Sequence, residues 1–223
     1  MKRQPKALIA WSSGKDSAFA LHEVRCAGNY EIVAALTTVI DTFSRVSMHG
    51  VREELLRVQL DAAGLPSIVV RIPFPCSNEI YEREMAAALA QAKSDGVRHV
   101  IFGDLFLADL RAYREEKLAA IGMTGVFPLW LRPTDKLAQE MIDAGVEAHL
   151  ATVDLKKLSA SFAGRRFDNA LLSALPAGID PCGENGEFHS FVKAGPMFAR
   201  PIRVSVGETV EREGFAYADL LPA

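Results

Sequence analysis

A hydroxyl-rich turn near the N-terminus joins an apolar segment of strand length to a helical pattern. Residues 6–18 read KALIAWSSGKDSA, and Ala18, Leu21 and Val24 then recur on one helical face. A helix N-terminus offers free backbone N–H groups to a phosphate, and small, hydroxyl and ammonium side chains complete the donor set. The turn is not a Walker A loop, because position 9 is isoleucine and position 16 is aspartate. We expect a phosphate-binding loop here; an ordinary serine-capped helix is the alternative.

Strand-like and helix-like segments alternate through the first 130 residues. Apolar segments at 7–11, 32–40, 68–72, 97–102 and 124–129 predict five strands separated by helices. Such alternation predicts an α/β fold, with a parallel five-stranded sheet and helices on both faces. Ligands bind such sheets at the carboxyl ends of the strands, which is where the hydroxyl-rich turn stands.

The pattern loosens after residue 130, so we expect two domains. Residues 1–130 are predicted to bind a nucleotide, and 131–223 to form a smaller α+β domain that binds the second substrate. Helices are predicted at 136–144 and 166–174 and an extended segment at 147–153. Alternation at 202–206 predicts an antiparallel strand with one wet face.

A second polar group follows the fourth predicted strand. Gly103 and Asp104 come directly after it, so they are expected at the same sheet edge as the hydroxyl-rich turn. Arg111 and Glu115 stand four residues apart on one face of the next helix and can form an ion pair. A solvated pair of small energetic weight is the alternative.

A third polar group lies at 182–191, which reads CGENGEFHSF. Glu184 and Glu187 offer carboxylates for Mg²⁺ or an amine, and His189 could move a proton. The alternative is a polar turn that leads into a strand. Cys182 stands among acidic residues, which raise a thiol pKa and argue against a thiolate nucleophile.

Taken together, these groups resemble the diphthine–ammonia ligase family, also known by the domain name DUF71, among the PP-loop ATP pyrophosphatases. The resemblance spans nearly the whole chain. It rests on residues 12–17, on 103–115, on Pro-Leu-Trp at 128–130, and on Gly-Glu-Asn-Gly-Glu at 183–187 continuing to Gly-Pro at 195–196. It implies a HUP-type (Rossmann-like) adenine nucleotide α-hydrolase domain followed by a smaller substrate domain. The implied activity is that of an AMP-forming ligase, which uses ATP and Mg²⁺ to adenylate a carboxylate and couples it to ammonia or an amine.

The resemblance and the polar groups together assign expected roles. ATP binding is expected of Ser12, Ser13, Gly14, Lys15, Asp16, Ser17, Thr38, His49, Gly103 and Asp104, with the adenine near 37–39. Catalysis is expected of Lys15, Glu184, Glu187 and His189. Substrate binding is expected of Arg111, Glu115, Asn185 and Ser190. Asp16 either holds Mg²⁺ or caps the helix, and His49 taken alone is more typical of a helix-end hydrogen bond than of a ligand.

The chain also departs from the family pattern. Ser13 replaces the first glycine of the loop, and Phe188-His189-Ser190 stands where the ligases carry Tyr-Glu-Thr. A partly protonated His189 would repel the trimethylammonium group of diphthine, so we expect a different acid. The Asn–His version resembles a bacterial subgroup for which a role in cobalamin salvage has been proposed. A tRNA-thiolation enzyme using Cys182 and a non-catalytic adenine-nucleotide sensor are the alternative functions.

Composition limits the partners. The 223 residues carry a formal charge of −3, so no bulk basic field favours nucleic acid. No apolar segment approaches the about 20 residues of a membrane span, and no signal-peptide pattern is present. We therefore expect a cytoplasmic protein whose partners are ATP or AMP, ammonia or an amine, and a carboxylate on a small molecule or modified residue. The sequence leaves a monomer and a homodimer open.

Overall fold

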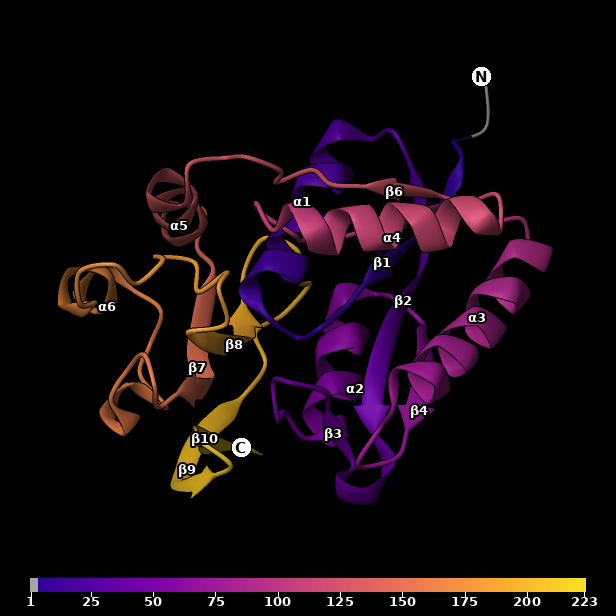
Figure 1. The fold of residues 1–223 in the computed structure, drawn as a ribbon. Coiled ribbons are helices and arrows are strands. Elements are labelled where there is room, and N and C mark those ends of the chain that lie inside the picture. The colour runs from indigo at the N-terminus through magenta and orange to yellow at the C-terminus, as the bar shows by residue number, and fades with distance from the viewer. Residues whose placement is uncertain (1–3) are drawn as a thin grey trace.

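The N-terminal half of the chain forms a mostly parallel sheet flanked by helices (Figure 1). The computed structural model describes residues 4–223. Strand β1 pairs with β2 on one side and β5 on the other, β4 lies beyond β2, and β6 lies beyond β5. The five parallel strands are β1 (Lys6–Ala10), β2 (Glu31–Ile40), β4 (Ser67–Ile72), β5 (His99–Ile101) and β6 (Thr124–Val126). This confirms the predicted parallel sheet.

A sixth, antiparallel strand of two residues was not predicted. The short helix η1 (Asp41–Phe43) and Ser44, which has a left-handed backbone, reverse the chain after β2. Strand β3 (Arg45–Val46) then returns along the end of β2. Two residues are too few for a periodic pattern, so only the tertiary structure reveals this strand.

Helices cover both faces of the parallel sheet, as predicted. Alternate residues of β1 point to opposite faces: Ile9 belongs to a buried cluster with Leu21 of α1, whereas Leu8 belongs to a cluster with Leu89 of α3 and Leu118 of α4. The four helices are α1 (Lys15–Ala27), α2 (Glu53–Ala63), α3 (Asn78–Ser94) and α4 (Ala108–Ala120). Helices α1 and α2 share one face, and α3 and α4 the other.

The C-terminal part forms a four-stranded antiparallel sheet in the order β8-β7-β10-β9. Its strands are β7 (Glu147–Asp154), β8 (Phe188–Ala194), β9 (Val204–Arg212) and β10 (Phe215–Pro222), and its helices are α5 (Thr134–Asp143), η2 (Ala160–Phe162) and α6 (Asn169–Ala174). The α+β class is confirmed. Strand β10 was not predicted, because small Ala216 and Ala218 occupy two of its buried positions and weaken the apolar alternation.

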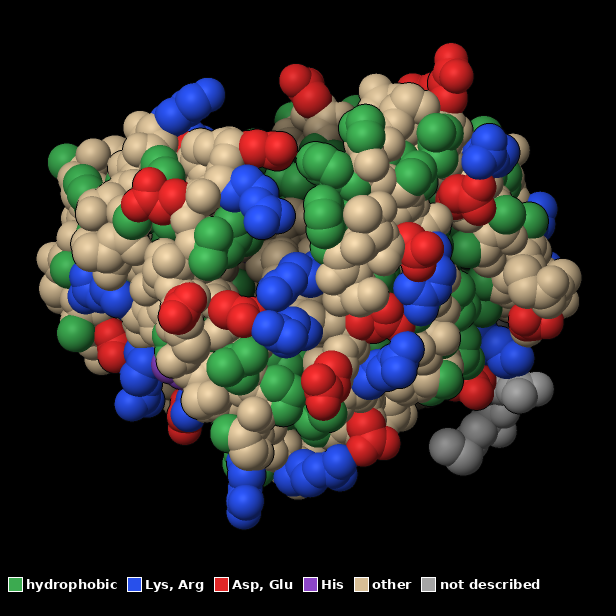
Figure 2. Space-filling view, turned by 90° about the horizontal axis from the view of Figure 1, so that it is seen from below, with side chains coloured by type: hydrophobic (Ala, Val, Ile, Leu, Met, Phe, Trp, Pro, Cys, Tyr) green, Lys and Arg blue, Asp and Glu red, His purple; other side chains and the backbone are tan. Residues whose placement is uncertain are grey.

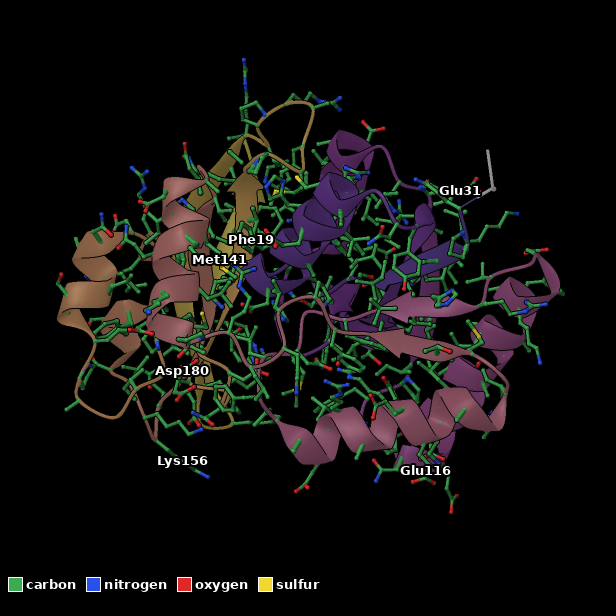
Figure 3. The ribbon with its side chains drawn as sticks, turned by 90° about the horizontal axis from the view of Figure 1, so that it is seen from above. Phe19, Glu31, Glu116, Met141, Lys156 and Asp180 are labelled. Carbon is green, nitrogen blue, oxygen red and sulfur yellow. The ribbon has the colours of Figure 1, made fainter. Side chains whose placement is uncertain are left out.

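The two sheets share one apolar core. The cluster on the α1 and α2 side continues without interruption into the C-terminal sheet. Figure 3 shows Phe19 of α1 and Met141 of α5 near each other at this junction, and both are buried. The loop before β8 is thereby held near the carboxyl edge of the parallel sheet.

Within residues 4–223, no helix is long and apolar enough to cross a membrane. On the face drawn in Figure 2, lysine and arginine side chains are interspersed with aspartate and glutamate. That face therefore carries no extended field of one sign.

Candidate functional site

A cleft of about 890 Å³ opens at the carboxyl edge of the parallel sheet and continues between α3 and α4. At the sheet edge it is lined by the β1–α1 loop, the end of β2 with the following turn, the segment after β5, and the loop before β8 with the start of that strand; beyond the edge, α3 and α4 line it. The predicted residues that line it are Ser12, Lys15, Asp16, Ser17, Thr38, His49, Gly103, Asp104, Glu184, Asn185, His189 and Ser190. Side chains such as Met85 and Leu110 give its far end an apolar wall.

The β1–α1 loop and the first turn of α1 (residues 12–17), called the phosphate-type loop, place serine hydroxyls at a helix N-terminus. Gly14 occupies the N-cap position of α1, so the capping role considered for Asp16 is wrong. The hydroxyls of Ser12 and Ser17 lie 3.2 Å apart, and the Ser17 hydroxyl donates to the Gly14 carbonyl (3.0 Å). The start of α1 thus lies beside two hydroxyls at the cleft, and the amides of Gly14 and Lys15 donate to the hydroxyls of Ser12 and Ser190.

Two glycines allow the parts of the cleft to approach each other. A Cβ atom at Gly103 would lie 2.6 Å from the carbonyl carbon of Asp16 and 2.7 Å from the nitrogen of Ser17, both backbone atoms. A Cβ atom at Gly14 would lie 2.6 Å from Cε1 of His49. Any side chain at either position would push the phosphate-type loop away from its neighbours.

Lys15 joins the two halves of the cleft. Its ammonium contacts both carboxylate oxygens of Asp16 (2.9 and 2.8 Å) and donates to the carbonyl of Cys182 in the loop before β8. Burial opposes the charged form, but Asp16 and the other anionic groups outweigh it and raise the pKa of Lys15. Burial also raises the pKa of Asp16, against the effect of Lys15. Because the ammonium contacts both of its oxygens, the Asp16 carboxylate is the anion that keeps the buried Lys15 charged.

Glu184 reaches across the cleft from the C-terminal part. The Leu105 N–H donates to its Oε1 (2.7 Å) and fixes the carboxyl group beside the segment after β5. Burial, reinforced by Asp16, raises the pKa of Glu184 to about 7. A cleft carboxyl group with a pKa near neutrality can both accept and return a proton at physiological pH.

The loop at 180–187 carries Glu184 and is shaped by two other carboxylates. Asp180 accepts from the N–H groups of Cys182 (3.2 Å) and Glu184 (2.9 Å). Glu187 accepts from the Asp180 N–H (3.2 Å) and from Nδ2 of Asn185 (3.0 Å). Glu187 is buried and does not line the cleft, so the structure separates it from Glu184.

His49 and His189 form a neutral aromatic pair in the cleft. Their ring centroids lie 4.6 Å apart. Burial and the neighbouring His189 lower the pKa of His49 to about 3, and burial and Lys15 lower that of His189 to about 4. The expectation of a partly protonated His189 is therefore wrong, because a buried ring beside a cation loses its proton. Nδ1 of His49 lies 2.9 Å from the Ser190 carbonyl, which can only accept, so Nδ1 carries the proton of the neutral ring.

The remaining predicted residues divide between the cleft and its outside. The Ser190 hydroxyl accepts from the Lys15 N–H (3.1 Å), and Asp104 pairs with Arg114 (2.7 Å). Arg111 pairs with Glu115 (2.8 Å), and its guanidinium also stacks on the ring of Trp130 (4.7 Å). The structure does not bring Arg111 or Glu115 to the cleft wall, nor Ser13 and Gly14, which lie in the loop beneath it.

Cys182 is poorly suited to nucleophilic chemistry. Its side chain is buried and donates to the Thr134 carbonyl (3.4 Å). Burial raises the pKa of the thiol far above its ordinary value. The geometry therefore agrees with the argument from sequence against a thiolate.

Two residues of this framework were not singled out from the sequence. Asp180 precedes a Pro-Cys-Gly turn, where an aspartate that bonds to later backbone amides is common. Gln59 is a lone polar residue among the buried positions in the middle of α2 and bonds to the β1–α1 loop. Among residues 4–223, no group of three or more His, Cys, Asp and Glu side chains could hold a metal ion.

Comparison with known proteins agrees with this architecture. The model of the diphthamide synthase N-terminal domain matches residues 5–124, and that of the diphthamide synthase C-terminal domain matches residues 133–220. The diphthine–ammonia ligase of Danio rerio is 26% identical over 231 residues, covering 93% of this chain and 89% of the fish protein. That of Bos taurus is 28% identical over 118 residues, covering 50% of this chain and 44% of the bovine protein.

Both halves of the chain thus match the two successive domains of one family, in the order in which the two sheets follow each other. The phosphate-type loop follows β1 of the parallel sheet, and the loop that leads into β8 of the antiparallel sheet brings Glu184 to the same cleft. The chain belongs to the diphthine–ammonia ligase family, a family of ATP-dependent amide ligases.

Proposed function

We propose that this protein is an AMP-forming ligase that adenylates a carboxylate with ATP and couples it to ammonia or an amine. The observation that carries the proposal is the meeting of two groups in one cleft: the phosphate-type loop with Lys15, and the carboxyl group of Glu184, whose pKa burial raises to about 7. A carboxylate oxygen of the substrate attacks the α-phosphorus of ATP and pyrophosphate leaves. The amine then attacks the acyl carbon, AMP leaves, and the amine proton passes to Glu184.

The residues of the cleft fit a nucleoside triphosphate. Its volume lies within the range of small-molecule sites, and the loop combines amide, hydroxyl and ammonium donors at a helix N-terminus. Lys15 balances the charge of the phosphates, and Ser12 and Ser17 donate hydroxyls. Thr38, His49, Gly103 and Asp104 complete the nucleotide side. Asp16 is the carboxyl group of the loop that faces the cleft, and it could join Mg²⁺ whose other ligands are phosphates and water.

We assign the loop at 180–187 and the start of β8 to binding the carboxylic acid and the amine. Glu184 is the proposed base, and Asn185 and the neutral His189 line the path to it. Glu187 contributes indirectly, because its carboxylate organises the loop that carries Glu184.

The acid differs from diphthine. A neutral imidazole at position 189 offers no charge to a trimethylammonium group, whereas a glutamate there would attract it. The different substrate specificity would therefore follow from the loss of the glutamate carboxylate at position 189 rather than from repulsion by a charged histidine. Corrinoid carboxylic acids are the first candidates to test.

Pyrophosphate release with ATP, ammonium and a panel of carboxylic acids tests this proposal. Wild type should release pyrophosphate and AMP with one class of acid. Glu184→Gln should bind ATP with unchanged affinity but lose turnover. Glu147→Gln, which changes a half-buried carboxylate at the start of β7 outside the cleft lining, should behave as wild type. Binding of ATP without pyrophosphate release under all conditions would favour a nucleotide sensor. Sulfur transfer to tRNA that depends on Cys182 would favour the thiolation enzyme.

A further inference from the structure

The phosphate-type loop contains a backbone conformation that its own residue does not favour. Ser13 has a φ of +71°, in the left-handed region that glycine adopts at small cost and serine does not. Its side chain cannot compensate, because the Ser13 hydroxyl is buried without a hydrogen-bond partner. Such a conformation persists only where the surroundings hold it.

The surroundings hold Ser13 through its carbonyl group. Nε2 of Gln59 donates to the Ser13 carbonyl (3.1 Å), and the Val192 N–H of β8 donates to the same oxygen (3.1 Å). In a planar trans peptide the next N–H points the opposite way. That N–H belongs to Gly14 and lies 3.3 Å from the hydroxyl of Ser12, which lines the cleft. The anchor on the carbonyl therefore turns the Gly14 amide toward Ser12, which lines the cleft, although Gly14 itself lies beneath the cleft wall.

The hydrogen-bond partners of Gln59 fix the orientation of its side-chain amide. Its Oε1 accepts from Nε1 of Trp11 (2.8 Å), and its Nε2 donates to the carbonyls of Ser13 and Val192 (2.7 Å to the latter). An indole N–H only donates and carbonyls only accept, so the amide has one possible orientation. One side chain thus joins α2 to β1, to the phosphate-type loop and to β8.

Gln59 occupies a position at which an apolar side chain would be expected. Its side chain is completely buried between Leu56 and Leu60 along the apolar face of α2, where a leucine or methionine would fill the space without polar groups to satisfy. The polar residue supplies hydrogen bonds that no apolar side chain could replace.

We propose that Gln59 is a positioning residue for nucleotide binding: it holds Ser13 in the left-handed conformation and so keeps the Gly14 amide directed to the phosphates. This inference rests on the proposed function, since it assumes that the loop binds the phosphates of ATP. It also explains how a serine can stand in this loop where the resembling enzymes carry glycine.

The substitution Ser13→Gly distinguishes a positioning role of Gln59 from a purely structural one. Gln59→Met should weaken ATP binding, measured by calorimetry, by about tenfold, because the loop must regain its conformation on binding. Ser13→Gly alone should change the affinity by less than about threefold. The double variant should recover most of the loss, because glycine adopts a positive φ without an anchor.

A matched control and a gentler variant keep the test decisive. Leu60→Ala removes a buried neighbour on the same helix; it should lower stability, leave ATP affinity unchanged and show no rescue by glycine. Gln59→Asn keeps a buried amide of shorter reach and should give an intermediate, equally rescued loss if Gln59→Met does not fold.

Three results would overturn the proposal in distinguishable ways. Failure of wild type to bind ATP would reject the proposed function and this inference with it. Binding by wild type and by the Gln59 variants with equal affinity would reject the role of Gln59 alone. A loss of affinity that Ser13→Gly does not restore would reduce Gln59 to a structural residue.

Discussion

Glu184 should make the stability of the protein depend on pH in a direction opposite to that of most carboxylates. Folding raises its pKa from 4.5 to about 7, so the folded protein binds the proton more tightly than the unfolded chain does. The contribution of Glu184 to the free energy of unfolding is fully present below pH 4.5 and is lost as the pH rises through about 7. One pKa unit corresponds to about 1.4 kcal/mol, so the free energy of unfolding should fall by on the order of 3 kcal/mol over this range.

Glu184→Gln removes this dependence with little change of shape. The amide oxygen can still accept from the Leu105 N–H, and the side chain cannot ionise. The variant should therefore match wild type at pH 4.5 and exceed its stability at pH 8 by up to about 3 kcal/mol. Urea unfolding followed by tryptophan fluorescence at a series of pH values measures the difference directly.

A second glutamate provides a control of opposite sign. Hydrogen bonds from Arg71 lower the pKa of Glu53, so its contribution is present above pH 4.5 and disappears on acidification. Glu53→Gln should destabilise the protein at pH 8 and approach wild type in acid. If the stability difference between Glu184→Gln and wild type were the same at pH 5 and pH 8, the buried, proton-exchanging Glu184 would be refuted.

Three further predictions concern Gly103, Cys182 and the pair of histidines. Gly103→Ala should destabilise the protein by about 1–3 kcal/mol and weaken ATP binding, because its Cβ would meet backbone atoms. The control Gly195→Ala, whose Cβ would first meet the side chain of a methionine, should lower the free energy of unfolding by less in a thermal unfolding experiment. Cys182 should resist iodoacetamide at pH 8 in the folded protein, and its rapid labelling, detected by peptide mass spectrometry, would contradict its burial. The imidazole ¹⁵N signals of His49 and His189 should stay those of neutral rings from pH 5 to pH 8, and a titration near pH 6.5 would show that the pair is solvated.

Helices and strands could be predicted from the sequence where they have a clear hydrophobic period or end at a recognisable turn. Apolar runs of strand length alternate with helical spacing through residue 130, and each predicted strand of the parallel sheet is present. The division at residue 130 stays a prediction, since the two sheets share one core. Short or weakly patterned strands such as β3 and β10 gave too little signal, because pairing with a distant partner stabilises them rather than their own periodicity.

The sequence could name the groups of the site but not their chemical states. Glu184 and Glu187 look equivalent in a run of four residues, yet one faces the cleft and the other is turned into its own loop. His189 looks like a proton carrier until its burial beside Lys15 and His49 is known. A pKa depends on desolvation and on charges brought together across the fold, and neither can be read from neighbours in the chain.

The α/β class and the family followed from the chain alone, because hydrophobic period and motifs of a few consecutive residues are local properties. Three relations needed the folded chain: Lys15 and Glu184 line one cleft, burial lowers the pKa values of His49 and His189, and Gln59 donates a hydrogen bond to the Ser13 carbonyl. These relations join residues that lie far apart in the chain, and they exist only once the two sheets have packed into one core.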